Sequence, residues 1–365
     1  MKQKAKGKKQ KAKSITRAFF LKPWILLFAS CGAPSEFQTV QESRILMDTL
    51  VSINVYVAKP AHEPTIRRAM TEAFAEMNRL DSLFSAYRAD SEVERLNDTA
   101  TISGVTISAD MDSVLQWAQW AAQISNGAFD ITVAPILRLW AFGTDSIGIP
   151  APEKIIAQMP RVGYKNLVLI ADTGAQKKMV VFRQPGMAID LGGVAKGYVV
   201  DRGLAMLRQA GIRDAMITAG GDLRTFASPL TAGRRYIWIQ HPRPANPDSA
   251  AQSFFGRFKL EGDAAVSTSG DYERFFINAN KRYHHIIDPH TGYPSERAIS
   301  ATVIAEISVQ ADALSTTLFV LGPERGLALA DSLPNVEAMV IYHDAGRLKW
   351  KATPGLTAKL EILKP

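Results

Sequence analysis

Residues 284–294 have the sequence His284-His285-Ile286-Ile287-Asp288-Pro289-His290-Thr291-Gly292-Tyr293-Pro294, and residues 311–316 have the sequence Ala311-Asp312-Ala313-Leu314-Ser315-Thr316. In the first stretch, Pro289 fixes φ and Gly292 permits positive φ, which predicts a turn that holds the two histidines in a fixed position. In the second, Asp312 and Thr316 are four residues apart. Side chains at this spacing share one face of a helix, so we expect a turn followed by a helix with two oxygen atoms on one side.

A carboxylate and a hydroxyl on one helix face form a hard, all-oxygen pair. Such a pair suits a magnesium ion that keeps several waters and binds substrate phosphates. The two stretches therefore indicate the floor of a nucleotide diphosphate and metal site. The alternative is that Asp312 caps a core helix running through Leu314, Leu318 and Leu321, and that His285 is an ordinary loop histidine.

The distribution of charge gives no support for a nucleic-acid partner, and we expect none. The chain has 365 residues, is 47% hydrophobic and has a pI of 9.4. Its first 30 residues contain nine lysines and arginines and no acidic residue. Without these nine, 34 basic residues face 35 acidic residues, which is a net charge of −1. The high pI therefore comes from the leader and carries no information about the folded part.

The basic leader is followed by a short apolar stretch, 23–29, and then by Ser30 and Cys31, the only cysteine. This pattern is typical of a bacterial lipoprotein signal peptide, residues 1–30, with lipidation of Cys31. We expect a tether over residues 31–43 and a folded domain over 44–365. The alternative is a disordered basic tail with a chance cysteine. A single cysteine excludes an intrachain disulfide and a Cys-x-x-Cys metal cluster.

The periodicity of apolar residues predicts interleaved helices and strands. Because they do not alternate in a regular βαβ rhythm, we predict an α+β fold with mixed sheets and helices packed around them, in a single large domain of two lobes. The expected helices are 64–83, 110–125, 194–209, 311–321 and 324–332. The expected strands are 51–57, 166–170, 180–182, 215–218, 236–240 and 336–342.

Several further stretches combine glycine, acids, hydroxyls or aromatic rings. Residues 188–198 form a glycine-rich turn that leads into a helix and brings Lys196 close to open backbone groups. Residues 218–222 end in Asp222, and residues 267–275 collect hydroxyls and acids. Near the amino terminus, residues 83–92 and 127–135 place aromatic rings beside acids, where a flavin or adenine ring could stack. Each stretch alone also fits a hairpin turn or a core segment.

Taken in order, these stretches resemble the ApbE family, the FAD:protein FMN transferases. The likeness covers about residues 44–345 and is carried by ordered blocks: Met-x-Thr at 47–49, Ser85-Ala86-Tyr87, Phe129-Asp130, Asp190-Leu-Gly-Gly-Val-Ala-Lys-Gly, Ala219-Gly-Gly-Asp, Thr268-Ser-Gly-Asp-Tyr, His285-Ile-Ile-Asp-Pro and Ala311-Asp-Ala-Leu-Ser-Thr. The resemblance implies a magnesium-dependent enzyme that splits FAD and links FMN to a Ser or Thr of an acceptor protein, with release of AMP. It also implies a lipid-anchored protein of the bacterial cell envelope that faces the periplasm.

The resemblance also assigns roles to residues. The metal would be held by Asp312, Thr316 and the main-chain carbonyl of Ala195, and His285 would assist deprotonation of the acceptor hydroxyl. The residues expected to contact the flavin nucleotide, or to lie close to it, are Met47, Ser85, Ala86, Tyr87, Asp130, Lys196, Tyr198, Asp222 and Ile286. One position departs from the family pattern, because Asp48 stands where the family has glycine.

Three functions remain open at this point. The first is the transferase, with acceptors among the flavin-carrying subunits of membrane redox complexes. The second is a magnesium-dependent FAD pyrophosphatase, in which water replaces the acceptor. The third is a non-catalytic flavin-binding lipoprotein.

Overall fold

We analysed a computed structural model that describes residues 37–58, 62–99, 104–172, 177–228, 231, 235–246 and 252–363. The predicted signal peptide and Cys31 lie outside these residues. The described residues fall in one compact unit. The α+β class and the single large domain are confirmed, and no helix in the described part of the chain has the length and apolar character needed to cross a membrane.

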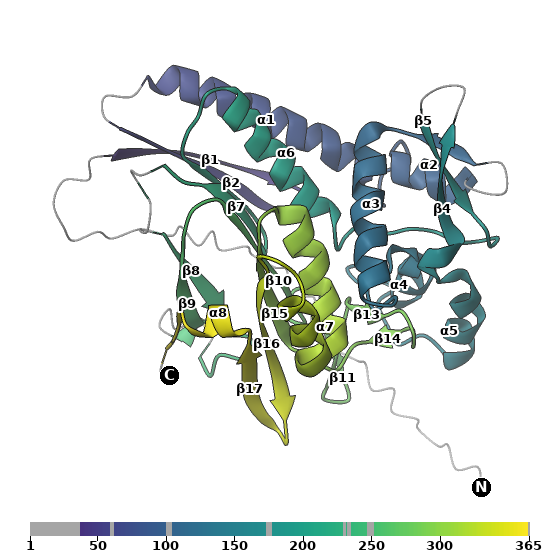
Figure 1. The fold of residues 1–365 in the computed structure, drawn as a ribbon. Helices are drawn as coiled ribbons and strands as arrows, with labels where there is room; N and C mark the ends of the chain where they lie inside the picture. The colour runs from purple at the N-terminus through teal and green to yellow at the C-terminus, as the bar shows by residue number, and fades with distance from the viewer. Residues whose placement is uncertain are drawn as a thin grey trace, which may run out of the picture. The chain divides into compact units, whose positions relative to one another are not determined.

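An eight-stranded sheet, antiparallel at every pairing, forms the centre of the domain (Figure 1). In spatial order its strands are β1 (Phe37–Leu46), β2 (Thr49–Ala58), β6 (Ala215–Ala219), β7 (Asp222–Phe226), β10 (Ala264–Gly270), β15 (Ser300–Ala305), β16 (Glu337–Asp344) and β17 (Arg347–Ala352). Apolar side chains such as Val51, Ile53 and Val55 alternate along β2 and are fully buried, as period-two alternation requires.

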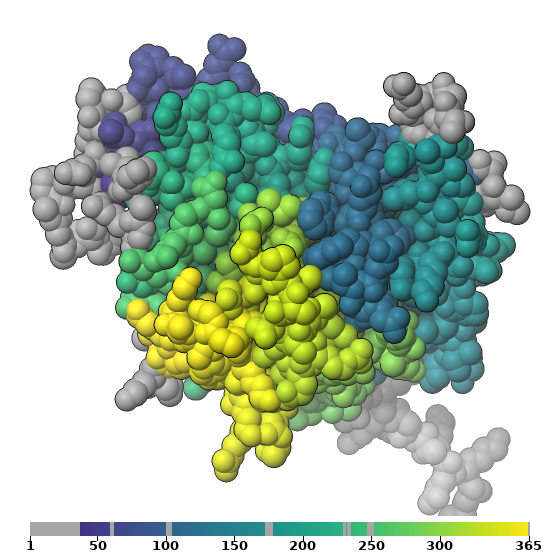
Figure 2. All heavy atoms as spheres, viewed as in Figure 1, coloured from purple at the N-terminus to yellow at the C-terminus, as the bar shows by residue number. Residues whose placement is uncertain are grey.

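Helices cover one face of this sheet. They are α1 (Glu63–Phe84), α6 (Ala195–Gln209) and α7 (Ser308–Asp331), and α3 (Ala109–Ile124) packs beside α7. In Figure 2 these helices form a continuous surface in front of the sheet. The other face is covered in part by a three-stranded sheet of β8 (Arg235–Gln240), β9 (Phe254–Leu260) and β18 (Leu360–Ile362). Between the two sheets lies a hydrophobic cluster that includes Phe258, Val266 and Met339.

Smaller elements complete the domain. A second three-stranded sheet consists of β3 (Val105–Ile107), β4 (Leu167–Asp172) and β5 (Lys177–Phe182). Two ribbons, β11 (Phe275–Asn278) with β12 (Lys281–His284) and β13 (Ile287–Asp288) with β14 (Tyr293–Pro294), flank His285 in the sequence. The short helices are α2 (Glu92–Thr99), α4 (Ala134–Trp140), α5 (Pro152–Gln158) and α8 (Pro354–Thr357), with 3-10 turns at Ile131–Val133, Met159–Arg161 and Tyr164–Asn166.

The predicted helices at 64–83, 110–125 and 194–209 are confirmed to within one residue at each end. The two helices predicted at 311–321 and 324–332 correspond to the two halves of α7. Gly322 separates them with φ 78° and ψ −179°, and Pro323 follows it. A side chain at Gly322 would lie 2.8 Å from Cβ of Arg297, so both the backbone angle and the space favour glycine here.

The tether predicted for residues 31–43 is wrong in its second half, because Phe37–Leu46 forms strand β1 and pairs along its whole length with β2. Only Val40 and Leu46 of this strand are buried. An edge strand is held mainly by backbone hydrogen bonds to one neighbour, so its sequence can be polar and gives little periodic signal. The folded domain therefore begins at Phe37 or before it.

Candidate active site

One end of the large sheet collects most of the polar residues singled out in the sequence. The β1–β2 turn, the β6–β7 turn and the end of β10 all lie there, because Leu46 pairs with Thr49, Ala219 with Asp222, and Asp222 with Ser267. The first turn of α6 and the first half of α7 approach the same end. Gly197 allows this close approach, since a Cβ there would lie 2.4 Å from the carbonyl oxygen of Ser308.

Asp312 and Thr316 face this end from successive turns of α7, as their spacing predicts. The backbone N–H of Gly197 donates to Asp312 Oδ2 at 2.9 Å, and Thr316 Oγ1 lies 3.1 Å from Ser269 Oγ. Gly193 sits against Thr316, because a Cβ at Gly193 would lie 3.3 Å from Thr316 Oγ1. The carboxylate and the hydroxyl therefore converge on the glycine-rich segment that precedes α6.

Lys196 joins two buried carboxylates. Its Nζ lies 3.0 Å from Asp222 Oδ2 and 3.3 Å from Asp312 Oδ1. Both aspartates are 2% exposed. Burial alone would lower the pKa of Lys196, but the two carboxylates outweigh it and raise that pKa. Burial, and next the charge of Asp222, raise the pKa of Asp312 well above its usual range. One ammonium is therefore shared by two acids, which leaves the group short of positive charge.

Three serine hydroxyls surround these acids and were not identified individually from the sequence. Ser267 Oγ donates to Asp222 Oδ1 and lies 3.2 Å from Ser315 Oγ, and Ser269 Oγ lies 2.8 Å from Ser315 Oγ. Ser267 and Ser269 are two residues apart on β10, so they point to the same face of the sheet. That period-two spacing was visible in the sequence, but only with β10 recognised as a strand. We call Lys196, Asp222, Ser267, Ser269, Asp312, Ser315 and Thr316 the acid–hydroxyl cluster.

His285 lies directly after β12 and is held by the backbone opposite it. Its N–H donates to the carbonyl oxygen of Arg274 at 3.1 Å, and its Nδ1 is 3.2 Å from the same oxygen. A carbonyl only accepts, so the neutral ring carries its proton on Nδ1 and leaves Nε2 as an acceptor. Burial first, and then the nearby charges of Arg274 and His284, lower the pKa of His285 to about 3. The ring is neutral at physiological pH.

The residues predicted to contact the flavin come from several segments. Met47, Ala86 and Tyr198, together with the predicted metal residue Ala195, pack against one hydrophobic cluster, which contains the buried faces of α1 and α6. Tyr198 also donates its hydroxyl to Asp110 at 2.8 Å and stacks edge-to-face on Phe84. Ser85 ends α1, and its Oγ accepts from the backbone N–H of Tyr87 at 3.2 Å. The Tyr87 side chain is 71% exposed.

Asp130 and Ile286 come from two further segments, and the neighbours of Asp130, Phe129 and Ile131, belong to the first cluster. Asp130 is buried and already accepts three hydrogen bonds, from Thr132 N, Thr132 Oγ1 and Tyr164 N at 2.8, 2.6 and 2.7 Å. These bonds fix the turn that begins at residue 131, so the carboxylate of Asp130 stabilises the local fold. Ile286 is buried in a second hydrophobic cluster with Leu318 and Phe319 of α7.

Asp48, the departure from the family pattern, preserves the turn in which it lies. Met47 and Asp48 have φ 53° and 56°, which is the two-residue turn typical of a tight hairpin. Aspartate tolerates this left-handed conformation better than most residues. The side chain of Asp81 accepts from the backbone N–H of Met47 at 3.0 Å and holds the turn in place.

The acid–hydroxyl cluster has the donors that a magnesium ion requires. No group of three or more His, Cys, Asp or Glu side chains close enough to hold a metal occurs among the described residues. Magnesium, however, uses one or two carboxylates and completes its shell with water and phosphate oxygens. Asp222 Oδ2 is buried, and its one partner among the described residues is Lys196 Nζ, 3.0 Å away. Two carboxylates and several hydroxyls that share a single ammonium therefore fit a hard cation.

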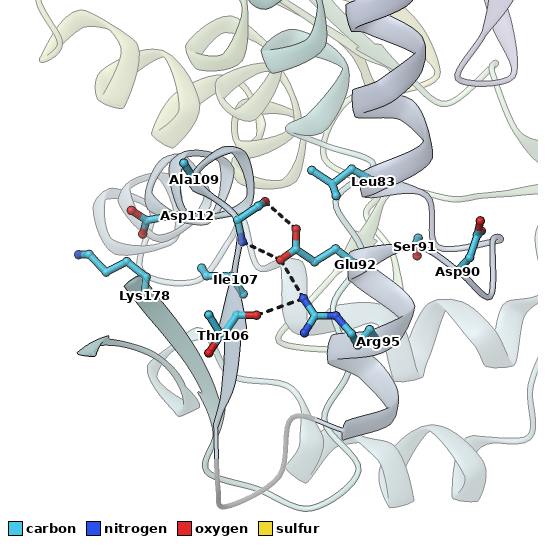
Figure 3. A pocket seen from close by; sticks show the side chains of 11 residues that line it. Leu83, Asp90, Ser91, Glu92, Arg95, Thr106, Ile107, Ala109, Asp112 and Lys178 are labelled. Atoms are coloured by element: carbon cyan, nitrogen blue, oxygen red, sulfur yellow. Dashed lines mark hydrogen bonds and ion pairs between the residues drawn. The ribbon is translucent and has the colours of Figure 1, made fainter. Parts of the chain in front are cut away.

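A groove of about 860 Å³ is lined by none of the residues of the acid–hydroxyl cluster (Figure 3). It is lined by Leu83 at the end of α1 and by residues of α2, β3 and α3, and it contains none of the predicted site residues. Its buried acid, Glu92, accepts from Ser108 N and Ser108 Oγ at 2.7 and 2.6 Å and from Arg95 at 3.0 Å. Glu92 is thus occupied in joining α2 to the start of α3.

The ApbE family model matches residues 47–340 of the chain. Among curated relatives, the FAD:protein FMN transferase of Treponema pallidum (strain Nichols) is 30% identical over 92% of each chain, and that of Escherichia coli (strain K12) is 32% identical over 72% of each chain. Among solved structures, the ApbE protein of Thermotoga maritima superposes with a TM-score of 0.74 at 29% identity, covering 90% of this chain and 100% of that one. The flavin transferase ApbE of Vibrio cholerae superposes with a TM-score of 0.73 at 28% identity, covering 88% and 99%.

Proposed function

The chain belongs to the ApbE family, and from this premise we propose that it is a magnesium-dependent FAD:protein FMN transferase. It moves FMN from FAD to a Ser or Thr hydroxyl of an acceptor flavoprotein and releases AMP. The observation that carries the proposal is the acid–hydroxyl cluster, in which two buried carboxylates share the single ammonium of Lys196. The surplus of carboxylate oxygen suits a divalent cation, which would in turn bind the diphosphate.

In the proposed site, Asp312, Thr316 and the carbonyl of Ala195 hold magnesium. Magnesium, when bound, neutralises the diphosphate and stabilises the charge that develops on the leaving oxygen. Lys196 adds a positive charge at the same place, and its position is fixed by Asp222. The hydroxyl of Ser267 donates to the Asp222 carboxylate, and that of Ser315 donates to the main-chain carbonyl of Asp312 and lies beside Ser269, so the hydroxyls form a hydrogen-bonded network at the two acids. Positioning and electrostatic stabilisation are the main demands of phosphoryl transfer, and these residues supply both.

His285 is the proposed acceptor for the proton of the attacking hydroxyl. The acceptor oxygen forms a bond to the phosphorus of the FMN half, the bond from that phosphorus to the bridging oxygen breaks, and AMP leaves with the bridging oxygen. Nε2 of His285 is free to take the hydroxyl proton because Nδ1 faces the Arg274 carbonyl. Its low pKa keeps the ring unprotonated before the reaction.

We further propose that the protein is a lipoprotein of the bacterial cell envelope, anchored at Cys31 and facing the periplasm. The basic leader, the short apolar stretch and the single cysteine support this placement. Its acceptors would then be flavin-carrying subunits of membrane redox complexes, whose hydroxyls lie on the same side of the membrane.

The test is AMP release from FAD by the purified protein, with magnesium, in the presence and absence of a candidate acceptor. Co-expression with the acceptor should leave flavin fluorescence on the denatured acceptor band. Asp312→Asn should abolish both signals, and Asp331→Asn, an exposed acid at the end of the same helix, should leave them unchanged. AMP release that proceeds equally without acceptor, with no fluorescent band, would establish a pyrophosphatase. FAD that stays intact after prolonged incubation would establish a flavin-binding protein.

A further inference from the structure

The three-stranded sheet of β8, β9 and β18 exposes aromatic rings on its outer face. Tyr236 and Trp238 of β8 are 37% and 36% exposed, and both are on the same side of the strand. The guanidinium of Arg257 on β9 lies 4.7 Å from the Tyr236 ring and 5.2 Å from the Trp238 ring. Phe254 extends the row, with its ring centre 5.2 Å from that of Trp238. We call Tyr236, Trp238, Phe254, Arg257 and Lys259 the aromatic face.

These rings are not part of the core. The opposite face of the same small sheet, with Ile239, Phe258 and Leu260, packs on the large sheet and is buried. Apolar residues exposed singly are normal on a protein surface. A tyrosine and a tryptophan exposed side by side on one strand instead indicate a surface that binds a membrane or a partner.

The aromatic face also carries positive charge. Arg257 is paired with Glu361 at 2.7 Å. Lys259, opposite Tyr236 in the ladder, and Lys359, next to β18, are exposed and form no ion pair with any described residue. Aromatic rings with lysine and arginine at their rim are the combination found at membrane–water interfaces, where the rings lie at headgroup level and the long basic side chains reach the phosphates.

The amino terminus of the domain lies near the first residue of β8, the strand that carries Tyr236 and Trp238, although the Arg235 side chain itself points to the buried side of that strand. The ring of Phe37, the first described residue, is 6.0 Å from that of Tyr56, and the guanidinium of Arg235 lies 4.7 Å over the same Tyr56 ring. Arg235 is the first residue of β8 and directly precedes Tyr236. Six residue steps separate Cys31 from Phe37, so a lipid on Cys31 lies at most about 20 Å of chain from this point.

We propose that the aromatic face rests on the surface of a lipid bilayer with anionic headgroups, beside the lipid attached to Cys31. This inference builds on the proposed lipid anchor. The anchor alone would let the domain rotate freely, whereas two contacts, a lipid and an adjoining aromatic and basic surface, define its orientation.

The orientation has a consequence for the reaction. Phe37 and Arg235 lie at the end of the large sheet opposite the acid–hydroxyl cluster, because Phe37 is at the far end of the β1–β2 hairpin from the Met47–Asp48 turn, and Arg235 donates to the carbonyl of Phe226 at the end of β7. Ten residues of β1 separate the two ends, which is about 30 Å of strand. The active site is therefore held away from the membrane, at the height of the soluble part of an acceptor.

The first experiment uses the chain from residue 31 onward with Cys31→Ser, which contains every described residue and has neither leader nor lipid. It is sedimented with vesicles of phosphatidylcholine, with and without phosphatidylglycerol. We expect binding to the anionic vesicles that weakens with salt, and a loss of roughly tenfold in binding for the Tyr236→Ser/Trp238→Ser double variant. Ile170→Ser, which removes a 46%-exposed apolar residue from another sheet, is the matched control and should bind like the parent. Equal losses in both variants overturn the proposal.

The second experiment uses the lipidated chain in vesicles that contain brominated lipids, which quench nearby tryptophans. We expect quenching that is largely lost in Trp238→Phe and retained in Trp350→Phe. Quenching that is unaffected by Trp238→Phe overturns the proposal whatever the sedimentation result. AMP release in detergent should be the same for the double variant and the parent. Failure of AMP release in all of them would instead overturn the proposed function and leave the membrane result unaffected.

Discussion

A buried aspartate next to a cation lies at each end of the β6–β7 hairpin, Asp214 directly before β6 and Asp222 at the start of β7, and the two sites are built differently. At one end, Asp214 is 2% exposed and its carboxylate is saturated. One oxygen accepts from Ser228 N, Ser228 Oγ and Thr231 Oγ1 at 3.1, 2.7 and 2.6 Å, and the other accepts from Arg235. One acid faces one cation, and the hydrogen bonds of the acid are complete. This is a structural ion pair that ties β8 to the large sheet.

At the other end, Asp222 and Asp312 share Lys196, which is the one described partner of Asp222 Oδ2. The aspartates at the two ends are equally buried, so burial of the acid does not separate a structural charge from a functional one. The ratio of acids to cations, and the number of hydrogen bonds that each carboxylate already accepts, do separate the two kinds of charge. Buried acids that outnumber their cation store unfavourable energy, which a bound metal ion can release.

The largest effect that this contrast predicts is for Asp312→Asn. The change removes the carboxylate proposed to hold magnesium, and we expect AMP release to fall by at least about 1000-fold. Stability should be unchanged or slightly higher, because the repulsion between Asp312 and Asp222 is also removed. Turnover measured over a magnesium titration, together with thermal unfolding, tests both parts. Full activity at limiting magnesium would reject the metal assignment.

Asp214→Asn should have the opposite effects, a clear loss of stability with little change in turnover. It breaks a buried pair and leaves Arg235 without its acid, so we expect a loss of about 3 kcal/mol in the free energy of unfolding. Turnover per folded molecule should stay within about twofold of the wild type, because this end of β7 is far from the site. Denaturant unfolding and AMP release on the same samples give the comparison. A loss of turnover at unchanged stability would contradict the distinction between the two ends.

Lys196→Met is a further test of the difference between the two ends, because it leaves two buried carboxylates with no cation. Without magnesium we expect the free energy of unfolding to fall by about 2 kcal/mol. Magnesium should restore most of this loss, since an ion that binds only the folded state stabilises it by mass action. The rise in melting temperature with magnesium should therefore be larger in Lys196→Met than in the wild type. The exposed Lys359→Met is the control. Equal rises in both variants would show that the acids do not bind the ion.

The part of this site that the sequence could predict is the part that is local in the chain. Asp312 and Thr316 are one helical turn apart, so their shared face follows from helix geometry alone. The glycine-rich turn before α6 is equally local, and its small residues at 193 and 197 do lie against α7. The strands with clear alternation, such as β2, were also found.

The remainder depends on topology. The pairing of Asp222 with Ser267, and of Asp214 with Arg235, joins segments that only the antiparallel order of β6, β7, β8 and β10 brings together. Strand β1 has the polar composition of an edge and gave no periodic signal. The hydrogen bonds that the Asp130 carboxylate accepts from Thr132 and Tyr164 could not be predicted either, and its assignment to the cofactor stays a prediction. A single sequence does not reveal how many of an acid's hydrogen bonds are already made.

A smaller effect concerns pH and the neutral state of His285. Its pKa is lowered to about 3 in the folded protein, against about 6.5 in an unfolded chain. Between these values the unfolded chain binds a proton that the folded protein does not, so stability is complete above about pH 6.5 and falls as the pH decreases toward 3. In this window His285→Gln should lose stability less steeply than the wild type, by at most about 1.4 kcal/mol per pH unit. His343→Gln, at an exposed position, is the control. Identical pH slopes would reject the assignment.

The smallest effect is expected for Asp48→Gly, in the β1–β2 turn at the end of the large sheet that holds the acid–hydroxyl cluster. Asp48 has φ 56°, a left-handed angle that is less strained for glycine, so the substitution should raise the free energy of unfolding by about 0.5 kcal/mol. Asn280→Gly is a matched control, because Asn280 occupies the second position of the β11–β12 turn with φ 61°. Asp48 is exposed and pairs with no described group, so its charge should be screened and the KM for FAD should change by less than about twofold. A clear fall in KM would show instead that this carboxylate repels the diphosphate. The surplus of negative charge at the site end would then extend from Asp222 and Asp312 to the hairpin turn.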